Sequence, residues 1–393
     1  MNRAFPAIRL AVALAFLANG LIIGAWAPQI PAMMERLDLS ESRLGLLILI
    51  FGLGALVAMP WCGGLIARHG SRRPLAGFAV LAPFALPAVV LAPGFAGAGF
   101  TMFCFGAVIG GMDVAMNANA VAVERRLDRA IMSSSHGFWS LGGFAGAAAG
   151  GALLQSYGAL AQALAVAAVS AAVIAAMLVW SLRDPPARST ERPSTRWPLT
   201  PLPYLLGLAA LFGMIPEGAV LDWAALYLQR ELGSNVAAAS LAFAGFSGAM
   251  ALMRFSGDAV RNRFGAVATM RVSCLVAGTG LVGAGLAPAA PLAIGFFALA
   301  GLGIANVVPI AFSAAGNQPG LAPGVGMSVA TTMGYSGILV APSAIGFIGE
   351  QTGFAPIFVV LALILFALAA LARVVATADR QKVIAQVPCH LGK

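Results

Sequence analysis

Acidic and amide side chains occur inside long apolar stretches of this chain, where lipid would not tolerate them. In the run GGMDVAMNANAVAVERR, Asp113, Asn117 and Glu124 follow one another at i, i+4 and i+11, so they share one face of a helix. A charged carboxylate at the centre of a bilayer costs roughly 2.5–3.5 kcal/mol on insertion scales. These side chains must therefore face a bundle interior or a wet cavity, where they could bind protons or a polar solute.

Two of the acids are the first candidates for proton coupling. Asp113 and Glu217 both fall well inside apolar segments, where a carboxylate shielded from water can bind and release a proton near neutral pH. The alternative is an acid that only hydrogen-bonds a neighbouring helix. Asp222 falls nearer the end of its segment and could be a hydrated rim residue. Glu124 adjoins Arg125 and Arg126, which favours an ion pair at the membrane surface.

Further polar and aromatic residues complete a predicted substrate and proton pathway. His136 could change charge with pH, or could be a structural histidine bonded to another helix. Ring stacking on a solute, or anchoring at the membrane interface, would explain Trp26, Trp139, Trp223 and Tyr335. The full predicted pathway comprises Asn19, Asp113, Asn117, His136, Trp139, Glu217, Asp222, Asn306 and Tyr335.

The composition places these residues in an integral membrane protein. Of 393 residues, 60% are hydrophobic and 9% are charged, against about 25% charged in soluble domains. The net charge of +9 is expected to reflect membrane topology, so we predict no nucleic-acid partner. The four cysteines and three histidines are scattered, and a P-loop motif is absent. We therefore expect no metal, no cofactor and no enzymatic activity.

Twelve apolar segments are long enough to span a bilayer, so the predicted fold is all-α. The stretch RDPPARSTERPSTRWPLTP is too polar to be buried and separates two groups of six. We expect an N-terminal six-helix bundle over 1–182, a linker over 183–202, a C-terminal six-helix bundle over 203–374 and a polar tail over 375–393.

Basic residues predict the orientation of the chain. With the N-terminus in the cytoplasm, nineteen of the 23 Lys and Arg residues fall on the inner side; only Arg36, Arg43 and Arg230 fall outside, and Arg254 falls within a helix. Both termini and the linker over 183–202 are then cytoplasmic, as for a multi-pass protein of an inner or plasma membrane.

The two halves of the sequence repeat one another. Gly142, Gly146, Ala147 and Gly151 match Gly337, Ala341, Pro342 and Gly346 at a constant offset of 195. Asp113 matches Asn306 at an offset of 193, and the pair Asn19-Gly20 matches Glu217-Gly218 at 198. Such a repeat indicates two pseudo-symmetric bundles.

Two six-helix repeats joined by a cytoplasmic loop resemble the major facilitator superfamily. This resemblance implies a monomeric secondary transporter in a lipid bilayer, with a small-molecule substrate bound by helices one, four, seven and ten. Those four helices carry Asn19, then Asp113 and Asn117, then Glu217 and Asp222, and finally Asn306.

The loop GGLIARHGSRR (63–73) resembles a signature of that superfamily, with Ala67 where its members have Asp. It implies an inner gate that includes Arg68, Arg72 and Arg73. The equivalent run in the second half, RFSGDAVRNRFG (254–265), places Asp258 within reach of Arg254 and Arg261 at i−4 and i+3. We expect these three residues to form a second gate cluster.

Two shorter resemblances bear on function. The run GGFAGAAAGG (142–151) is similar to the glycine-rich signature of the superfamily's antiporters, although close helix packing would also explain it. DVAMNANAVAVERR, SSSHGFWSLGG and the run Glu217–Trp223 resemble the branch that contains MosC and YbjJ. The sequence therefore predicts a proton-coupled transporter of a small polar organic solute, tilted towards export by antiport. Symport uptake of a sugar or cyclitol and a non-transporting receptor are the alternatives.

Overall fold

The computed structural model describes residues 6–127, 131–184, 199–318 and 325–379, and these residues are helical with short connections. The helices are α1 (Ala7–Leu37), α2 (Glu41–His69), α3 (Arg72–Leu91), α4 (Gly94–Leu127), α5 (Met132–Trp180), α6 (Leu202–Arg230), α7 (Val236–Phe264), α8 (Ala266–Gly285), α9 (Ala290–Ile304), α10 (Val307–Gly316), α11 (Val325–Thr352) and α12 (Ala355–Ala370), followed by a 3₁₀ helix, η1 (Ala372–Asp379). The fold is thus all-α, as predicted.

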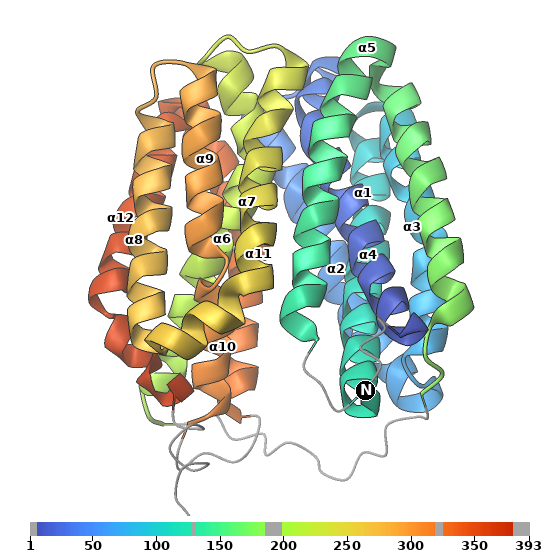
Figure 1. Ribbon diagram of the computed structural model, residues 1–393. Helices are drawn as coiled ribbons and strands as arrows, with labels where there is room; N and C mark the ends of the chain where they lie inside the picture. The colour runs from blue at the N-terminus through green and yellow to red at the C-terminus, as the bar shows by residue number, and fades with distance from the viewer. Residues whose placement is uncertain (1–5, 128–130, 185–198, 319–324, 380–393) are drawn as a thin grey trace, which may run out of the picture.

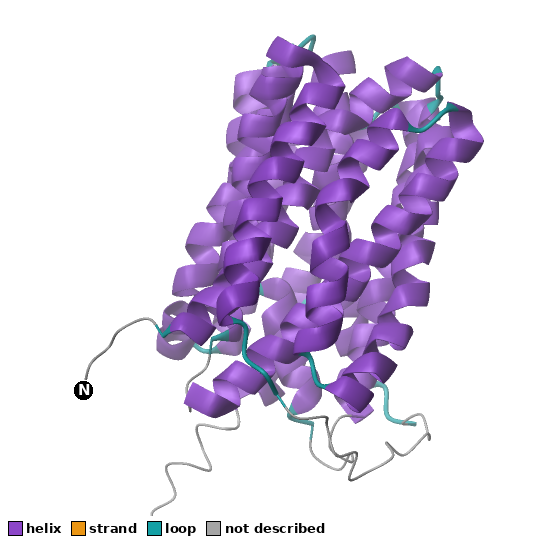
Figure 2. Cartoon of the chain, turned by 90° about the vertical axis from the view of Figure 1, so that its right-hand side faces the viewer, coloured by secondary structure: helices purple, strands orange, loops and turns teal. Residues whose placement is uncertain are grey.

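The long helices run side by side from one end of the molecule to the other (Figure 2). Nine helices in the described part of the chain are long and apolar enough to cross a membrane, or ten when the bent pair α12–η1 counts as one span. The first of these counts treats α5 as one helix, yet its 49 residues are interrupted at Gly158, whose φ is 83°. A left-handed φ suits glycine, and the interruption makes two spans of α5.

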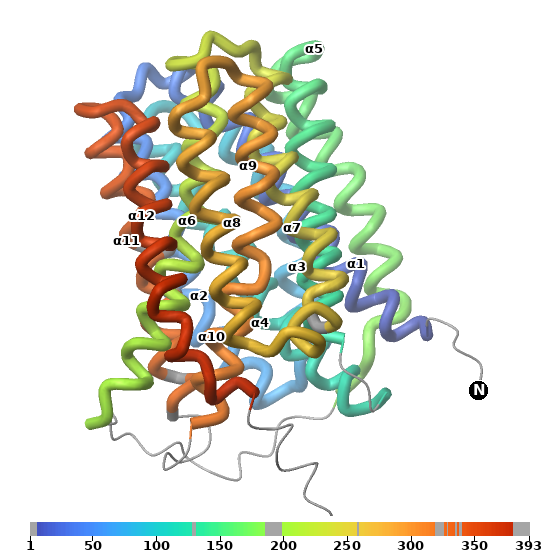
Figure 3. The backbone as a smooth tube through the Cα atoms, turned by 60° about the vertical axis from the view of Figure 1, so that its left-hand side comes forward, coloured from blue at the N-terminus to red at the C-terminus, as the bar shows by residue number. Residues whose placement is uncertain are grey.

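The helices divide into two groups along the chain. In Figure 1, α1–α5 (blue to green) lie on one side and α6–α12 (yellow to red) on the other. Within the second group α8 packs on both α9 and α12, as Figure 3 shows. Contacts between the groups run mainly along α5–α7 and α2–α11. We call the end where α1 begins the inner end and the opposite end the outer end.

Glycines allow the helices to approach closely. Gly142 and Gly146 of α5 lie directly against the backbone of α1 at Leu17 and Leu21. Gly20 of α1 lies in turn against the backbone carbonyl of Trp139. Because lipid gives little hydrophobic drive for helix association, such small-residue contacts supply much of the packing. The glycine-rich run in α5 therefore has a structural role in this fold.

The internal repeat extends to the helix caps at the inner end. Asp184 accepts hydrogen bonds from the backbone N–H of Ser71 at 2.9 and 3.0 Å, and Asp379 accepts from that of Ala266 at 2.8 and 2.9 Å. Both members of the second contact lie 195 positions beyond those of the first (184 + 195 = 379; 71 + 195 = 266). Each carboxylate thus caps the first turn of α3 or α8, where unpaired N–H groups and the helix dipole favour an anion.

The predicted helix over 291–315 corresponds to one apolar span, Ala290–Gly316, that is interrupted at two residues. The helix α9 ends at Ile304 and α10 begins at Val307, with Asn306 between them. Pro309 explains the break, because it has no N–H and its ring clashes with the carbonyl four residues earlier, that of Ala305.

Candidate functional site

An ion pair lies in the middle of the molecule. Arg254 of α7 places Nη2 3.3 Å from Oε2 of Glu217 in α6, and its Nη1 donates to Ser140 Oγ of α5 at 2.7 Å. The side chains remain 13% and 22% exposed, so solvent reaches the pair. This arrangement joins three helices and both halves of the chain. From the sequence we expected Arg254 to pair with Asp258. The structure gives it Glu217, and the side chain of Asp258 lies outside the described residues.

Asn19 links three helices of the first half. Its Oδ1 accepts a 2.9 Å hydrogen bond from Trp139 Nε1 of α5, and its Nδ2 lies 3.4 Å from the carbonyl oxygen of Ile109 in α4. Asn19 is 1% exposed, so its contact with Ile109 is shielded from solvent, whereas Trp139 is partly exposed. Trp139 precedes Ser140, which binds Arg254. The two polar clusters are therefore continuous along one turn of α5.

Asp113 lies one turn beyond Ile109 on α4 and has an amide partner. Asn117 Nδ2 donates to the Asp113 backbone oxygen at 2.9 Å and to its Oδ1 at 3.3 Å. Both side chains are partly exposed. The i, i+4 spacing seen in the sequence therefore produces a contact. The carboxylate has an uncharged neighbour, whereas Glu217 is held by a guanidinium.

Two predicted residues are more deeply buried than expected. Asp222 is 6% exposed, so it is an interior residue and not a hydrated rim residue. The neighbouring Trp223 is fully buried and stacks on Phe354 with ring centroids 5.2 Å apart. Trp26 is also buried and packs edge-on against Phe105. Burial of Trp26 and Trp223 inside the bundle excludes the interfacial anchoring that the sequence left open for them.

The remaining pathway residues are distributed around this centre. His136 packs edge-on against Phe16 of α1, with ring centroids 5.1 Å apart. Asn306 is 8% exposed and its Oδ1 lies against Gly257 of α7. The side chain of Tyr335 lies outside the described residues.

The predicted gate arginines differ in their contacts. Arg72 donates to Ser181 Oγ at 2.9 Å and to the Leu178 carbonyl at 3.1 Å, both within the first half. Arg68 and Arg73 are exposed at the inner end. In the second half, Arg261 donates to Ser313 Oγ at 2.9 Å and to the Ala378 carbonyl at 2.8 Å. The described contacts of Arg72 and Arg261 thus brace each half separately.

Two contacts near this site were not identified from the sequence. Ser140 gives no signal among the many serines, and only the fold brings it to Arg254. Glu124, expected in an ion pair with neighbouring arginines, instead accepts hydrogen bonds from the backbone N–H groups of Ile131 and Met132 at 2.6 and 2.9 Å. It therefore caps the start of α5. The E-x-x-x-x-x-x-I spacing resembles no common capping motif, so the sequence could not have shown this.

The fold of the described residues, with long apolar helices packed side by side in two groups, is that of a multi-pass membrane protein. The model of the Major Facilitator Superfamily matches residues 11–342, and the chain belongs to that family. It is 36% identical over 366 residues to an uncharacterised MFS-type transporter of Yersinia pestis, covering 92% of this chain and 94% of that one. It is 33% identical over 348 residues to membrane protein MosC of Rhizobium meliloti, covering 87% and 84%.

Solved structures show the same fold at low sequence identity. The nucleoside transporter NupG superposes with a TM-score of 0.66 at 14% identity, covering 95% of this chain and 99% of that one. A bacterial homologue of the human lysosomal transporter Spinster, in an inward-facing and occupied conformation, gives 0.69 at 15% identity, covering 95% and 97%. At such identities the likeness concerns the fold alone. The family match and the relatives above identify the protein as a multi-pass membrane transporter of this superfamily.

Proposed function

We propose that the protein is a proton-coupled secondary transporter of a small polar organic solute. The contact Glu217–Arg254–Ser140 carries this proposal, because it places titratable and charged groups between the two halves that must move in alternating access. A proton on Glu217 would remove the negative charge that holds Arg254 and would release the guanidinium for other partners. Asp113, with its amide partner Asn117, provides a second proton site in the first half.

Polar groups at the centre favour a polar solute. Asn19, Asn117, Asp113 and the Arg254 pair could replace water around hydroxyl, amine or carboxylate groups. An apolar solute would leave these groups without partners on binding, which is costly. The direction of transport has weaker support. The glycine run that favoured export packs α5 on α1, so it does not distinguish export from import. Import by symport and export by antiport are therefore tested in the same assay.

The test uses purified protein in liposomes that contain a pH-sensitive dye. Pools of sugars, cyclitols, amines and amino acids are added, and proton movement is recorded for the wild type, Asp113→Asn, Glu217→Gln and the double variant. Glu35→Gln, an exposed acid at the end of α1, is the matched control. We expect one pool to move protons in the wild type and control but not in the double variant.

The sign of the proton movement separates symport from antiport. Proton-driven flux that survives in the double variant would exclude Asp113 and Glu217 as the coupling sites. Binding of a pool compound, detected as a thermal shift, without solute flux would support a receptor instead.

A further inference from the structure

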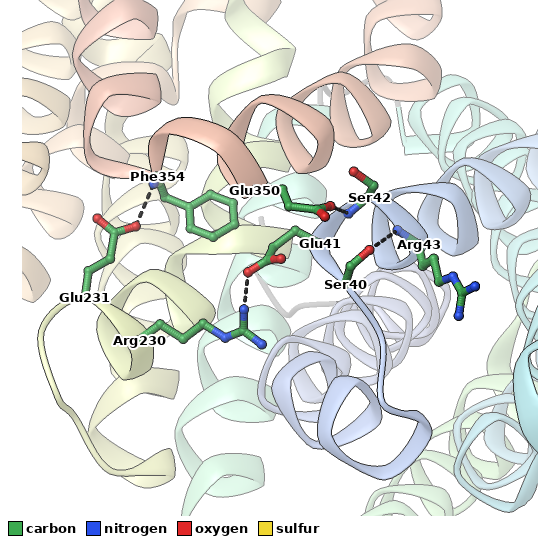
Figure 4. Close-up of polar contacts among 8 residues, drawn as sticks. All are labelled: Ser40, Glu41, Ser42, Arg43, Arg230, Glu231, Glu350 and Phe354. Atoms are coloured by element: carbon green, nitrogen blue, oxygen red, sulfur yellow. Dashed lines mark hydrogen bonds and ion pairs between the residues drawn. The ribbon is translucent and has the colours of Figure 1, made fainter.

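Two hydrogen bonds join the halves of the molecule at its outer end, and the internal repeat relates them. Glu350 Oε2 of α11 accepts from the backbone N–H of Ser42 in α2 at 2.9 Å, as Figure 4 shows. Gln155 Oε1 of α5 accepts from the backbone N–H of Ala237 in α7, also at 2.9 Å. The positions correspond at the offset of 195 (155 + 195 = 350; 42 + 195 = 237). In each contact, one half caps a helix of the other half.

The two contacts differ in charge. Both N–H groups belong to the first turn of a helix, where the donors lack intrahelical partners and the dipole favours an anion. The N-cap residues Ser40 and Asn235 satisfy other donors of the same turns, those of Arg43 and Ala238. The N–H group of Ser42 in α2 meets a carboxylate, whereas that of Ala237 in α7 meets a neutral amide. Charge-assisted hydrogen bonds are roughly twice as strong as neutral ones.

The α2–α11 contact is reinforced by a second charged contact and by close packing. Arg230, the last residue of α6, forms an ion pair with Glu41 in the first turn of α2. Gly346 of α11 lies against the Glu41 carbonyl, and Gly45 of α2 lies against Ser343 of α11. At the outer end, α2 is therefore held by two helices of the other half.

The α5–α7 contact, by comparison, continues towards the inner end. Ser247 Oγ of α7 donates to the Ser140 carbonyl of α5 at 2.8 Å, and Ser133 Oγ donates to the Arg254 carbonyl at 3.3 Å. Phe138 and Phe255 pack edge-on across the same contact. Loss of the Gln155 bond would leave these contacts between α5 and α7 in place.

We propose that Glu350, together with the Glu41–Arg230 pair, forms a catch that holds the outer end of α2 against α11 and α6 only while Glu350 is charged. Gln155 forms the corresponding contact at α7, which does not respond to protons. Protons in the outer water would then release the α2–α11 side first. The charged groups around Glu350 are Glu41 and Arg43 on α2, and Arg230 and Glu231 at the end of α6 (Figure 4). This inference does not depend on Asp113 or Glu217.

The direction of the pH effect follows from the contact. Glu350 is fully exposed to water beyond the apolar part of α11, and the hydrogen bonds from Ser42 lower the pKa of its carboxyl group. A group whose pKa is lowered in the closed state stabilises that state above its ordinary pKa. The stabilisation is lost as the pH falls through the lowered value. Acid on the outer side therefore weakens the catch.

The test measures the separation of the two halves at the outer end. Spin labels are attached at Ala96→Cys, at the start of α4, and at Ala289→Cys, before α9, in a full-length chain whose four native cysteines are replaced. Both positions are exposed. Distance distributions are recorded by electron spin resonance between pH 7.5 and pH 3.5. The variants are Glu350→Gln, which copies the α5–α7 contact, Gln155→Glu, which copies the α2–α11 contact, and Asp113→Asn.

We expect the population with the longer distance to rise about two-fold or more on acidification of the wild type. Glu350→Gln should abolish this rise while keeping a hydrogen bond to Ser42. Gln155→Glu should add a second acid-dependent rise, and Asp113→Asn should behave as the wild type. A rise of equal size in Glu350→Gln, or no rise in the wild type, would overturn the catch. A rise that disappears in Asp113→Asn instead would assign the response to the central site.

Discussion

Glu217 and Arg254 form an ion pair between α6 and α7, and the same guanidinium donates to Ser140 across the boundary between the two halves. Removing one charge leaves the other without its partner, which costs more than replacing both by neutral groups. Because solvent reaches both side chains, the cost should be smaller than the 3–5 kcal/mol typical of a fully buried pair. The effects of replacing Glu217 and Arg254 on stability should therefore not be additive.

We expect Glu217→Gln and Arg254→Gln each to lower stability more than the double variant does. The coupling energy should be about 1–2 kcal/mol. The free energy of unfolding of the wild type, the two single variants and the double variant is measured in mixed micelles with increasing dodecyl sulfate. Ser140→Ala, which removes the second partner of Arg254 without changing charge, is the control. Strictly additive effects of the two single variants would show that the pair does not couple.

A second prediction concerns Asn19 and Trp139. Asn19→Ala leaves the partly buried indole N–H of Trp139 without its acceptor, at a cost of about 0.5–1.5 kcal/mol. Adding Trp139→Phe removes the orphaned donor, so the double variant should recover part of this loss. Thermal unfolding in detergent checks the order of stability. If Trp139→Phe lowered the stability of Asn19→Ala still further, the hydrogen bond would not be what Asn19 contributes there.

Much of the architecture could be predicted from the sequence. Spans follow from runs of about 20 apolar residues, and the repeat follows from glycine spacing, since both are properties of the linear chain. The same reasoning identified Asp113 and Asn117, which contact each other at i, i+4. The span over 290–316 was predicted, but its short interruption before α10 was not, although Pro309 carries the signal for it.

Contacts between distant segments could not be predicted in the same way. Spacing within one helix suggested Asp258, whose side chain lies outside the described residues, as a partner of Arg254. It gave no indication of Glu217, which contacts Arg254 from a different helix 37 positions away. Asp222 was assigned a possible rim position from its place in the segment, yet packing of α6 buries it. Helix periodicity gives the face of a residue but not the helix that this face meets.

The paired caps at the inner end give a third prediction. Asp184 accepts from the backbone N–H and the hydroxyl of Ser71 and lies 3.3 Å from the Arg72 N–H, whereas Asp379 accepts from Ala266 N–H. Asp184→Ala should therefore cost more than Asp379→Ala, with both losses at about 0.5–2 kcal/mol. Hydrogen exchange at the first amides of α3 and α8 measures each effect locally. Each variant should accelerate exchange in its own helix only. Faster exchange in both helices would instead indicate global destabilisation.

The last prediction compares two glycines that the repeat relates, Gly20 in α1 and Gly218 in α6. A Cβ at Gly20 would lie against the backbone carbonyl of Trp139, which cannot move without separating α1 from α5. At Gly218, no heavy atom lies within 4 Å of the added Cβ, and the residue lines a small pocket between α6 and α11. Gly20→Ala should therefore lower the free energy of unfolding by about 1–3 kcal/mol. Gly218→Ala should leave it unchanged or raise it by up to about 1 kcal/mol, because alanine favours a helix more than glycine does.

Dodecyl sulfate unfolding of both variants in the same micelles gives the comparison. Equal losses at the two sites would show that the close α1–α5 approach does not limit stability, and a larger loss at Gly218 would contradict the open space that the structure places beside it.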